Sequence, residues 1–245
     1  MDAPVPWHRG ELLGFDLETT GIDRFTDVPV SYALVTAVAG EVVARDGALV
    51  SPGRQIPDGA TAVHGITTWR ACFDGQPVAE AIDHVATVLV EASERGVPVV
   101  GMNLSYDLTI VDVQSRRLHG AGLTQRGWSG PALDALPMDR KVDKFRKGKR
   151  TLQALCAHYG VALEDAHDAS ADAEGALRVV LALAARYPEL ADAGPEALHH
   201  EQVGWHREWA VSFDAYCREN GRPPLDPSEF VWPLAPIELA AREVA

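Results

Sequence analysis

The chain has 245 residues, of which 47% are hydrophobic and 23% are charged, an ordinary balance for a globular protein. Its net charge of −13 excludes a surface that attracts nucleic acid everywhere, so a polyanion site must be a local basic patch. The start of the chain lacks the apolar segment of a signal peptide, and no apolar run reaches the ~18–20 residues that span a bilayer. The three cysteines form no CxxC pair, so we expect a protein of the reducing cytoplasm. From the lack of a long apolar run, we also expect no membrane partner.

Short apolar runs bounded by turn residues predict three strands near the start of the chain. They cover residues 12–17, 29–39 and 41–50. The last two form a hairpin around Gly40, and the Pro- and Gly-rich residues 51–59 predict a loop. The spacing of apolar side chains predicts a helix from residue 77 to about 95. A buried strand, parallel to the first, follows at residues 97–101.

The next part of the chain alternates helices with short extended segments. We expect helices at residues 103–118, 151–159 and 168–187. A glycine-rich loop at 120–130 and a short strand at 131–136 follow the first of them. This order of elements indicates an α/β fold, in which helices pack on a mixed β-sheet.

The predicted elements are interrupted near residue 190, and a helical, aromatic-rich C-terminal extension follows. We therefore divide the chain into a core domain at 1–189 and an extension at 190–245. Three tryptophans are interpreted as packing anchors of the extension, with a partner or dimer interface as the alternative: Trp205, Trp209 and Trp232. Three histidines lack an acid or cysteine at a metal-ligand spacing and are placed on the surface: His199, His200 and His206.

Two acidic residues, Asp16 and Glu18, stand at the end of the first predicted strand. Side chains alternate between the faces of a strand, so both carboxylates project from one face. Neighbouring carboxylates at a buried strand end repel each other and lose hydration, and a divalent cation offsets both costs. Hard cations such as Mg²⁺ or Mn²⁺ take oxygen ligands, whereas an isolated pair of acids would simply meet water.

Two further acids, Asp107 and Asp172, share helical faces with apolar residues. An acid within an apolar stripe is costly unless it is paired or bound to a metal. The two helices and the strand end therefore supply four carboxylates that can converge on metal. His167, five residues before Asp172, would stand at the rim of the same site.

The segments that carry these residues resemble the three motifs of the DEDD exonuclease superfamily. The first motif corresponds to residues 15–21 (FDLETTG), the second to 103–107 (NLSYD) and the third to 167–172 (HDASAD). The histidine of the third motif is typical of the DEDDh branch, which includes the proofreading epsilon subunit of bacterial DNA polymerase III, ribonuclease T and oligoribonuclease. Because the motifs occur in the right order over roughly residues 10–187, the chain is identified as similar to this DnaQ-like branch.

The resemblance implies a ribonuclease H-like fold and hydrolysis that releases nucleoside monophosphates from a 3′ end. Two ions, Mg²⁺ or Mn²⁺, would clamp the attacking and leaving oxygens of an in-line displacement. Asp16 would bridge the ions, and Glu18, Asp107 and Asp172 would complete their ligand shells. His167 would act as the general base, because an unperturbed imidazole has a pKa of ~6.5.

Other residues of the resemblance are candidates for substrate binding. Thr19 would contact the terminal nucleotide or only shape the turn after the strand. Asn103 would cap the following helix and steady the site. His64, in an epsilon-like HGIT segment, would face the substrate or serve as a turn residue. Met102 departs from the histidine of many epsilon-like proteins, which bears on substrate preference, and Asp134 resembles an acid for which we expect a structural role.

All four lysines of the chain lie within residues 140–150, which also contain three arginines. We interpret Lys144, Lys147 and Lys149 as residues that bind the phosphates of a substrate and restore local attraction. The alternative is a mobile, solvated loop.

These features predict a metal-dependent 3′–5′ exonuclease that acts on single-stranded or frayed nucleic acid ends. DNA is favoured over RNA because of the segment around His64, although RNA-directed members of the family carry the same five site residues. The alternatives are a non-catalytic nucleic-acid or partner-binding module, and a proofreading subunit held by a polymerase partner through residues 190–245. A homodimer through the extension, the substrate length and the pathway stay open.

Overall fold

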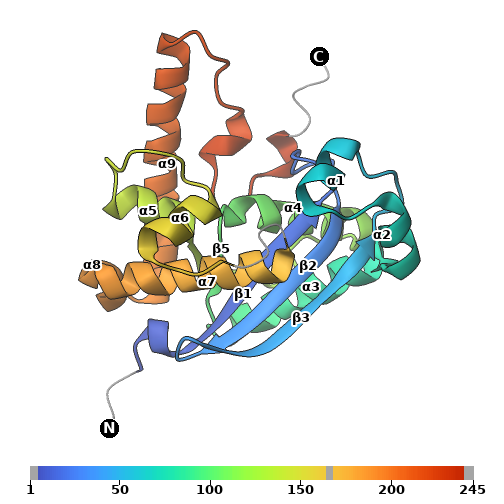
Figure 1. Cartoon of the computed structure of the whole chain (residues 1–245), viewed down its shortest axis with the longest axis horizontal. Helices are drawn as coiled ribbons and strands as arrows, with labels where there is room; N and C mark the ends of the chain where they lie inside the picture. Colours follow the sequence, from blue (N-terminus) through green and yellow to red (C-terminus); the bar gives the residue numbers. More distant parts are fainter. Residues whose placement is uncertain (1–4, 164–167, 240–245) are drawn as a thin grey trace.

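A computed structural model describes residues 5–163 and 168–239 (Figure 1). These residues contain a six-stranded sheet of order β4-β3-β2-β1-β5-β6. Its strands are β1 (Glu11–Thr19), β2 (Pro29–Val38), β3 (Glu41–Ser51), β4 (Gln76–Pro77), β5 (Val99–Gly101) and β6 (Ala132–Asp134). β1, β2 and β3 pair antiparallel, whereas β5 lies parallel to β1 and to β6. This mixed sheet confirms the predicted α/β fold.

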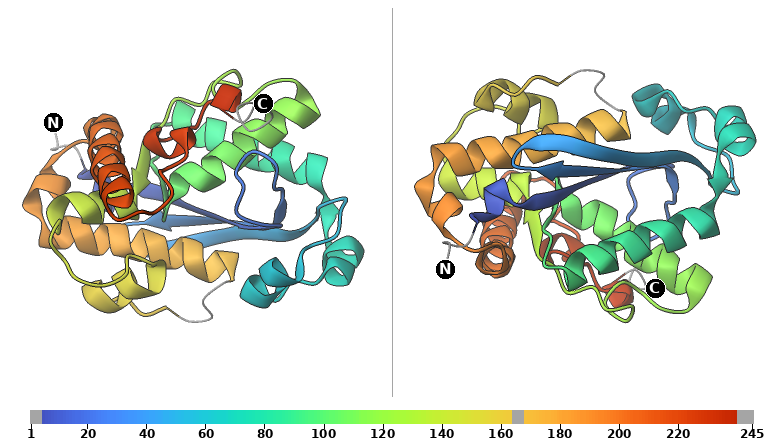
Figure 2. Two further views of the ribbon diagram at one scale, coloured as in Figure 1. Left: turned by 90° about the horizontal axis from the view of Figure 1, so that it is seen from above. Right: turned by 90° about the horizontal axis from the view of Figure 1, so that it is seen from below.

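Helices cover both faces of the sheet. They are α1 (Asp58–His64), α2 (Thr68–Asp74), α3 (Val78–Glu94), α4 (Leu104–His119), α5 (Ala135–Val142), α6 (Leu152–Tyr159), α7 (Ala169–Arg186), α8 (Pro188–Asp192) and α9 (Pro195–Glu219). Helix α7 packs on β1 and β2, and α6 packs on α7, whereas α3 and α4 lie against the opposite face (Figure 2). In the described part of the chain, no helix has the length and apolar character needed to cross a membrane.

The alternation of side chains along β1 divides the core into two layers. Phe15 and Leu17 join the layer beneath α3 and α4, whereas Leu12 joins the layer beneath α7. Gly14 lies on the α7 side, where an added Cβ would come within 3.0 Å of the Ala173 carbonyl oxygen. This close approach lets the backbone of α7 lie directly against β1.

Four helices, α1, α2, α5 and α8, were not predicted from the sequence, and α1 begins inside the loop predicted for residues 51–59. Helix α5 illustrates the reason. The strand predicted over residues 131–136 ends at Asp134, because its carboxylate accepts a hydrogen bond from the Leu136 amide and caps α5. The first part of the basic stretch is therefore helical rather than a loop. Helix α2 is similarly capped by Thr67, whose hydroxyl accepts a hydrogen bond from the Arg70 amide.

The C-terminal extension covers the edge of the sheet. Strand β6 is an edge strand, and its backbone is paired by side chains of α9: His199 Nδ1 accepts from the Ala132 amide (3.1 Å) and Gln202 Oε1 from the Asp134 amide (2.8 Å). Gln202 Nε2 also donates to the Ala132 carbonyl (2.9 Å). These contacts satisfy backbone groups that an open edge would leave exposed.

The surface placement predicted for two of the histidines is wrong. His199 and His206 are 7% and 8% exposed, because each pairs with backbone in the interior. His206 Nε2 lies 2.8 Å from the Glu229 carbonyl oxygen. Burial lowers the pKa of both imidazoles, which keeps them neutral beside these partners.

Candidate active site

Three carboxylates meet where β1 ends beside the first turn of α7. Within the described part of the chain, Asp16, Glu18 and Asp172 offer oxygens that all lie within 4.8 Å of one another. All three residues are partly buried. The pleat of β1 directs Asp16 and Glu18 toward α7, and Asp168 starts that helix by accepting hydrogen bonds from the Ser170 (3.0 Å) and Ala171 (3.2 Å) amides.

Asp107 lies beside this group, in the first turn of α4, and is 5% exposed. Burial raises the pKa of Asp16 well above its ordinary value, and the next causes are the charges of Asp107 and Asp172. Burial also raises the pKa of Asp107, followed by the charge of Asp134. Burial and neighbouring carboxylates therefore both disfavour the ionised form of these acids.

The pKa of Glu18 is shifted in the same direction. Burial raises the pKa of Glu18 to about 8, with further contributions from the charges of Asp172 and Asp168. Cations favour the ionised form of each acid, and an all-oxygen donor set suits a hard divalent cation. The residues present therefore fit a divalent metal. The fifth predicted site residue, His167, lies outside the described residues.

Asp134 organises the start of α4. Its Oδ1 accepts hydrogen bonds from the Asn103 (2.9 Å) and Leu136 (3.0 Å) amides. Its Oδ2 accepts from the Leu104 amide (2.9 Å) and from Trp232 Nε1 (3.2 Å). These contacts confirm the structural role expected for Asp134. The part played by Trp232 was not foreseen, since no local pattern links residues so far apart in the chain.

The capping role predicted for the Asn103 side chain is wrong. Asn103 occupies the N-cap position with φ of 61° and ψ of 38°, but among the described residues its side chain makes no capping hydrogen bond. The carboxylate of Asp134 takes that role instead. The backbone of Asn103 is thereby held in a left-handed conformation at the edge of the site, which asparagine tolerates better than most residues.

Thr19 is the last residue of β1 and is 8% exposed. Its hydroxyl donates to the Gly21 carbonyl (2.7 Å) and lies 3.0 Å from the Tyr106 hydroxyl. The Tyr106 hydroxyl also donates to the Gly21 carbonyl (2.5 Å). Thr19 and Tyr106 thus tie the turn after β1 to α4, which carries Asp107.

His64 ends α1 and lies on a cavity that opens beside the acids. Its Nδ1 accepts a hydrogen bond from the Ile66 amide (3.0 Å), so it stabilises the turn after α1. The cavity has a volume of about 440 Å³, and Glu18, Asp168 and Arg70 also line it. His64 therefore combines a turn contact with a place beside the site.

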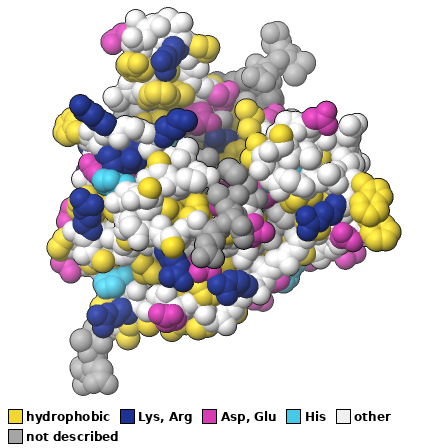
Figure 3. All heavy atoms as spheres, in the orientation of Figure 1, with side chains coloured by type: hydrophobic (Ala, Val, Ile, Leu, Met, Phe, Trp, Pro, Cys, Tyr) yellow, Lys and Arg dark blue, Asp and Glu magenta, His cyan; other side chains and the backbone are white. Residues whose placement is uncertain are grey.

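The basic stretch divides into two sets of side chains. Arg146 and Arg150 pair with the fully buried carboxylate of Asp139. These ion pairs hold the loop between α5 and α6 on the protein. The lysines Lys144, Lys147 and Lys149 are exposed on the same loop. Figure 3 shows Lys and Arg side chains gathered over this part of the surface.

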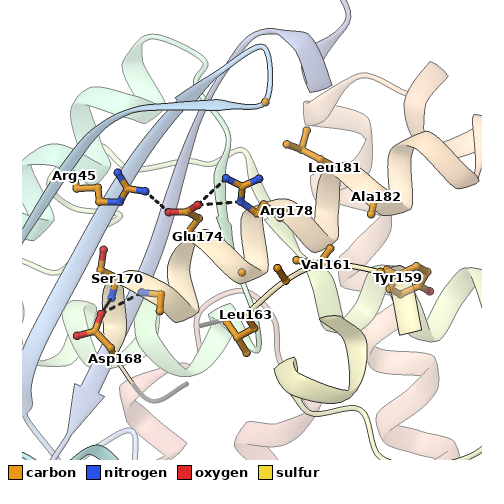
Figure 4. Close-up of a pocket in the computed structure, with 15 residues that line it drawn as sticks. Arg45, Tyr159, Val161, Leu163, Asp168, Ser170, Glu174, Arg178, Leu181 and Ala182 are labelled. Carbon is orange, nitrogen blue, oxygen red and sulfur yellow. Dashed lines mark hydrogen bonds and ion pairs between the residues drawn. The ribbon is translucent and has the colours of Figure 1, made fainter. Parts of the chain in front are cut away.

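A larger cavity, of about 1050 Å³, lies beside α7 (Figure 4). Its Glu174 forms ion pairs with Arg45 and with Arg178 (2.7 Å), so its charges are largely compensated. Among the residues that the structure describes, its lining includes none of the four site carboxylates. It shares Arg45, Asp168 and Ser170 with the smaller cavity beside the acids.

The arrangement of the sheet is shared with nucleases of ribonuclease H-like fold. The structure of E. coli exonuclease I in complex with a dT13 oligonucleotide superposes with a TM-score of 0.61 and 19% identity, over 75% of this chain and 43% of that chain. A second exonuclease I structure gives a TM-score of 0.63 and 21% identity, over 75% of this chain and 42% of that chain. The fold is therefore a ribonuclease H-like α/β fold.

A family model described as an exonuclease matches residues 13–180, and the chain belongs to this exonuclease family, in its DEDDh, DnaQ-like branch. A DNA polymerase III subunit epsilon-like protein of Rhodobacter capsulatus is 32% identical over 199 residues, which cover 75% of this chain and 26% of that protein. A PolC-type DNA polymerase III of Lacticaseibacillus paracasei is 27% identical over 182 residues, 74% of this chain and 12% of that protein. The chain thus spans about a quarter or less of these relatives.

Proposed function

We propose that this protein is a 3′–5′ exonuclease that hydrolyses the phosphodiester bonds of single-stranded or frayed DNA and releases nucleoside monophosphates. The observation that carries the proposal is the meeting of three carboxylate oxygens within 4.8 Å, in a chain of the exonuclease family. Acids held this close at a strand end favour a cation-dependent reaction over a purely structural role.

Asp16, Glu18 and Asp172 would hold the cations, with Asp107 as a fourth carboxylate beside Asp16. We propose two ions, Mg²⁺ or Mn²⁺, because four converging acids exceed what a single charge of +2 would balance. When bound, such ions supply positive charge to the oxygens that gain charge during an in-line displacement at phosphorus. The carboxylates would hold the ions at one place, where their charge would orient the scissile phosphate.

His167 is proposed as the general base that takes a proton from the attacking water. Imidazole titrates near neutral pH, and nearby carboxylates favour its protonated form once the proton has moved. The lysines Lys144, Lys147 and Lys149 are proposed to contact substrate phosphates. Thr19, His64 and Asn103 are proposed to border the terminal nucleotide.

DNA is proposed as the substrate because the relatives are DNA polymerase III proteins, and because exonuclease I binds a dT13 oligonucleotide in its solved complex. Residues 190–245 are proposed as an extension of the exonuclease domain that covers β6. A polymerase or a second copy of the chain would have to meet its outer face, where Val203 and Val211 are 42% and 54% exposed.

The test compares 5′-labelled single-stranded DNA and RNA of one sequence, with Mg²⁺, Mn²⁺ or a chelator. Wild-type protein is expected to produce a ladder that shortens from the 3′ end in either metal, faster on DNA, and none in chelator. Asp172→Asn removes one carboxylate without changing side-chain shape and is expected to abolish the ladder. Binding of both oligonucleotides without cleavage in either metal would instead support the non-catalytic binding module, and faster RNA cleavage would overturn the choice of DNA.

A further inference from the structure

Two aromatic side chains, Trp69 and Phe73, form a stacked pair on the outer face of α2. They are 71% and 75% exposed, although both are large and apolar. Their ring centroids lie 5.2 Å apart and their planes are inclined by 7°. Figure 3 shows hydrophobic side chains at the edge of the molecule over α2. Single exposed apolar residues are common, but a parallel pair of large rings in solvent calls for a physical explanation.

The opposite side of α2 is firmly attached to the protein. Ala71 is fully buried in a small core with Val30 and Ile56. The Thr68 hydroxyl accepts a hydrogen bond from the Ile56 amide (2.9 Å), which ties the start of the helix to the preceding loop. The aromatic pair is therefore presented on a fixed helix, and its exposure is not a result of poor packing of α2.

Helix α2, which carries the pair, also contributes a residue to the cavity beside the acids. That cavity extends from Glu18 past His64 to Arg70, which is the neighbour of Trp69 on α2. Arg70 is exposed and supplies a positive charge at this cavity. Helix α2 therefore carries both a residue that lines this cavity, Arg70, and the aromatic pair.

We propose that Trp69, Phe73 and Arg70 form a subsite at which unpaired bases of the substrate strand stack, away from the end that is hydrolysed. This subsite rests on the proposed function. Parallel rings extend a base stack, and stacking accepts any sequence because every base has a π-face. Stacking also suits a protein with a net charge of −13, because this attraction does not depend on charge.

The composition of the surface favours nucleic acid over a protein partner. Around the two rings, α2 carries the exposed charged residues Arg70 and Asp74, so the apolar area is narrow. Protein interfaces have broader apolar centres from which charged residues are depleted. Two stacked rings and an exposed guanidinium on the same helix suit the bases and phosphates of a nucleic acid strand better than they suit a protein surface.

The test measures binding by fluorescence anisotropy in chelator, where no hydrolysis interferes, with labelled dithymidylate and an oligothymidylate of about twelve nucleotides. The double variant Trp69→Ala/Phe73→Ala is expected to bind the long oligonucleotide about ten-fold more weakly and the short one unchanged. Trp69→Phe keeps an aromatic ring and is expected to retain most of the affinity. Tyr216→Ala, which removes an aromatic ring that is 45% exposed on α9, is the matched control and should bind like wild type.

The dependence of affinity on salt concentration distinguishes the contribution of the two rings from that of Arg70. The loss caused by removing the rings is expected at all salt concentrations, whereas Arg70→Ala should reduce the slope of affinity against salt. Affinity of the double variant for the long oligonucleotide within two-fold of wild type, with unchanged thermal unfolding, would overturn the subsite. If the wild-type protein cleaves DNA but the double variant binds the long oligonucleotide as tightly as wild type, only the subsite is refuted and the exonuclease activity stands. Ring-dependent binding without any cleavage supports the subsite and refutes the exonuclease activity.

Discussion

Replacement of Asp134 by asparagine tests how the C-terminal extension supports the acidic site. The carboxylate of Asp134 accepts four hydrogen bonds, from the Asn103 and Leu136 amides on one oxygen and from the Leu104 amide and the Trp232 indole on the other. Asparagine has nearly the same shape but replaces one oxygen by an NH₂ group. Each oxygen of Asp134 accepts two of the four hydrogen bonds, so the two N–H groups at the replaced oxygen would face the NH₂ group of asparagine, which is itself a donor.

The expected loss of stability follows from these contacts. A buried donor left without an acceptor costs about 1–3 kcal/mol, so two of them cost about 2–6 kcal/mol. Removal of a buried negative charge offsets part of this, because burial raises the pKa of Asp134 and disfavours its ionised form. We expect a net loss of about 2–4 kcal/mol for Asp134→Asn. Trp232→Phe removes one bond and leaves no donor unpaired, so its loss should be about 1–2 kcal/mol.

Urea denaturation followed by circular dichroism measures both losses. In thermal melts, the midpoints should fall by about 4–16 °C for Asp134→Asn and by about 2–8 °C for Trp232→Phe. Glu91→Gln, an exposed acid on α3, is the control and should change stability by less than about 0.5 kcal/mol. A loss for Asp134→Asn no larger than that of the control would refute the reasoning.

Three further predictions concern the charged side chains. Burial raises the pKa of Glu18 from 4.5 to about 8, so the folded protein retains a proton that the unfolded chain releases. Stability without metal should therefore decrease as pH rises from about 4.5 to about 8, and Glu18→Gln should reduce this slope in thermal melts; an equal slope would contradict the assignment. Asp172→Asn relieves repulsion on its neighbours, so it should raise the melting temperature in chelator and lose the stabilisation by Mg²⁺; a wild-type response to Mg²⁺ would argue against cation binding there. Replacing Lys144, Lys147 and Lys149 together by alanine should reduce the slope of log affinity for single-stranded DNA against log salt by about 2, and an unchanged slope would exclude phosphate contacts.

Much of the acidic site could be predicted from local rules. The period of two along β1 places Asp16 and Glu18 on one face, and the observed split of the core between Leu12 and Phe15 follows the same rule. The helical period assigned Asp107 to a buried face, where it is 5% exposed. Such rules succeed because each depends on the backbone geometry of only a few neighbouring residues.

Tertiary structure alone decided the features that join distant parts of the chain. His199 is buried because α9 covers the edge strand β6, and His206 is buried where α9 meets the segment that contains Glu229. Nothing near either histidine in the sequence specifies these neighbours. The arginines and the lysines of the loop between α5 and α6 differ in their environment. Asp139 is buried beneath this loop and forms ion pairs with Arg146 and Arg150 but not with the lysines. Trp232 reaches Asp134 across 98 positions of the chain. The sequence by itself determined which acids share a face of each element, whereas packing between elements determined which acids meet and what holds them there, because such contacts depend on the whole fold.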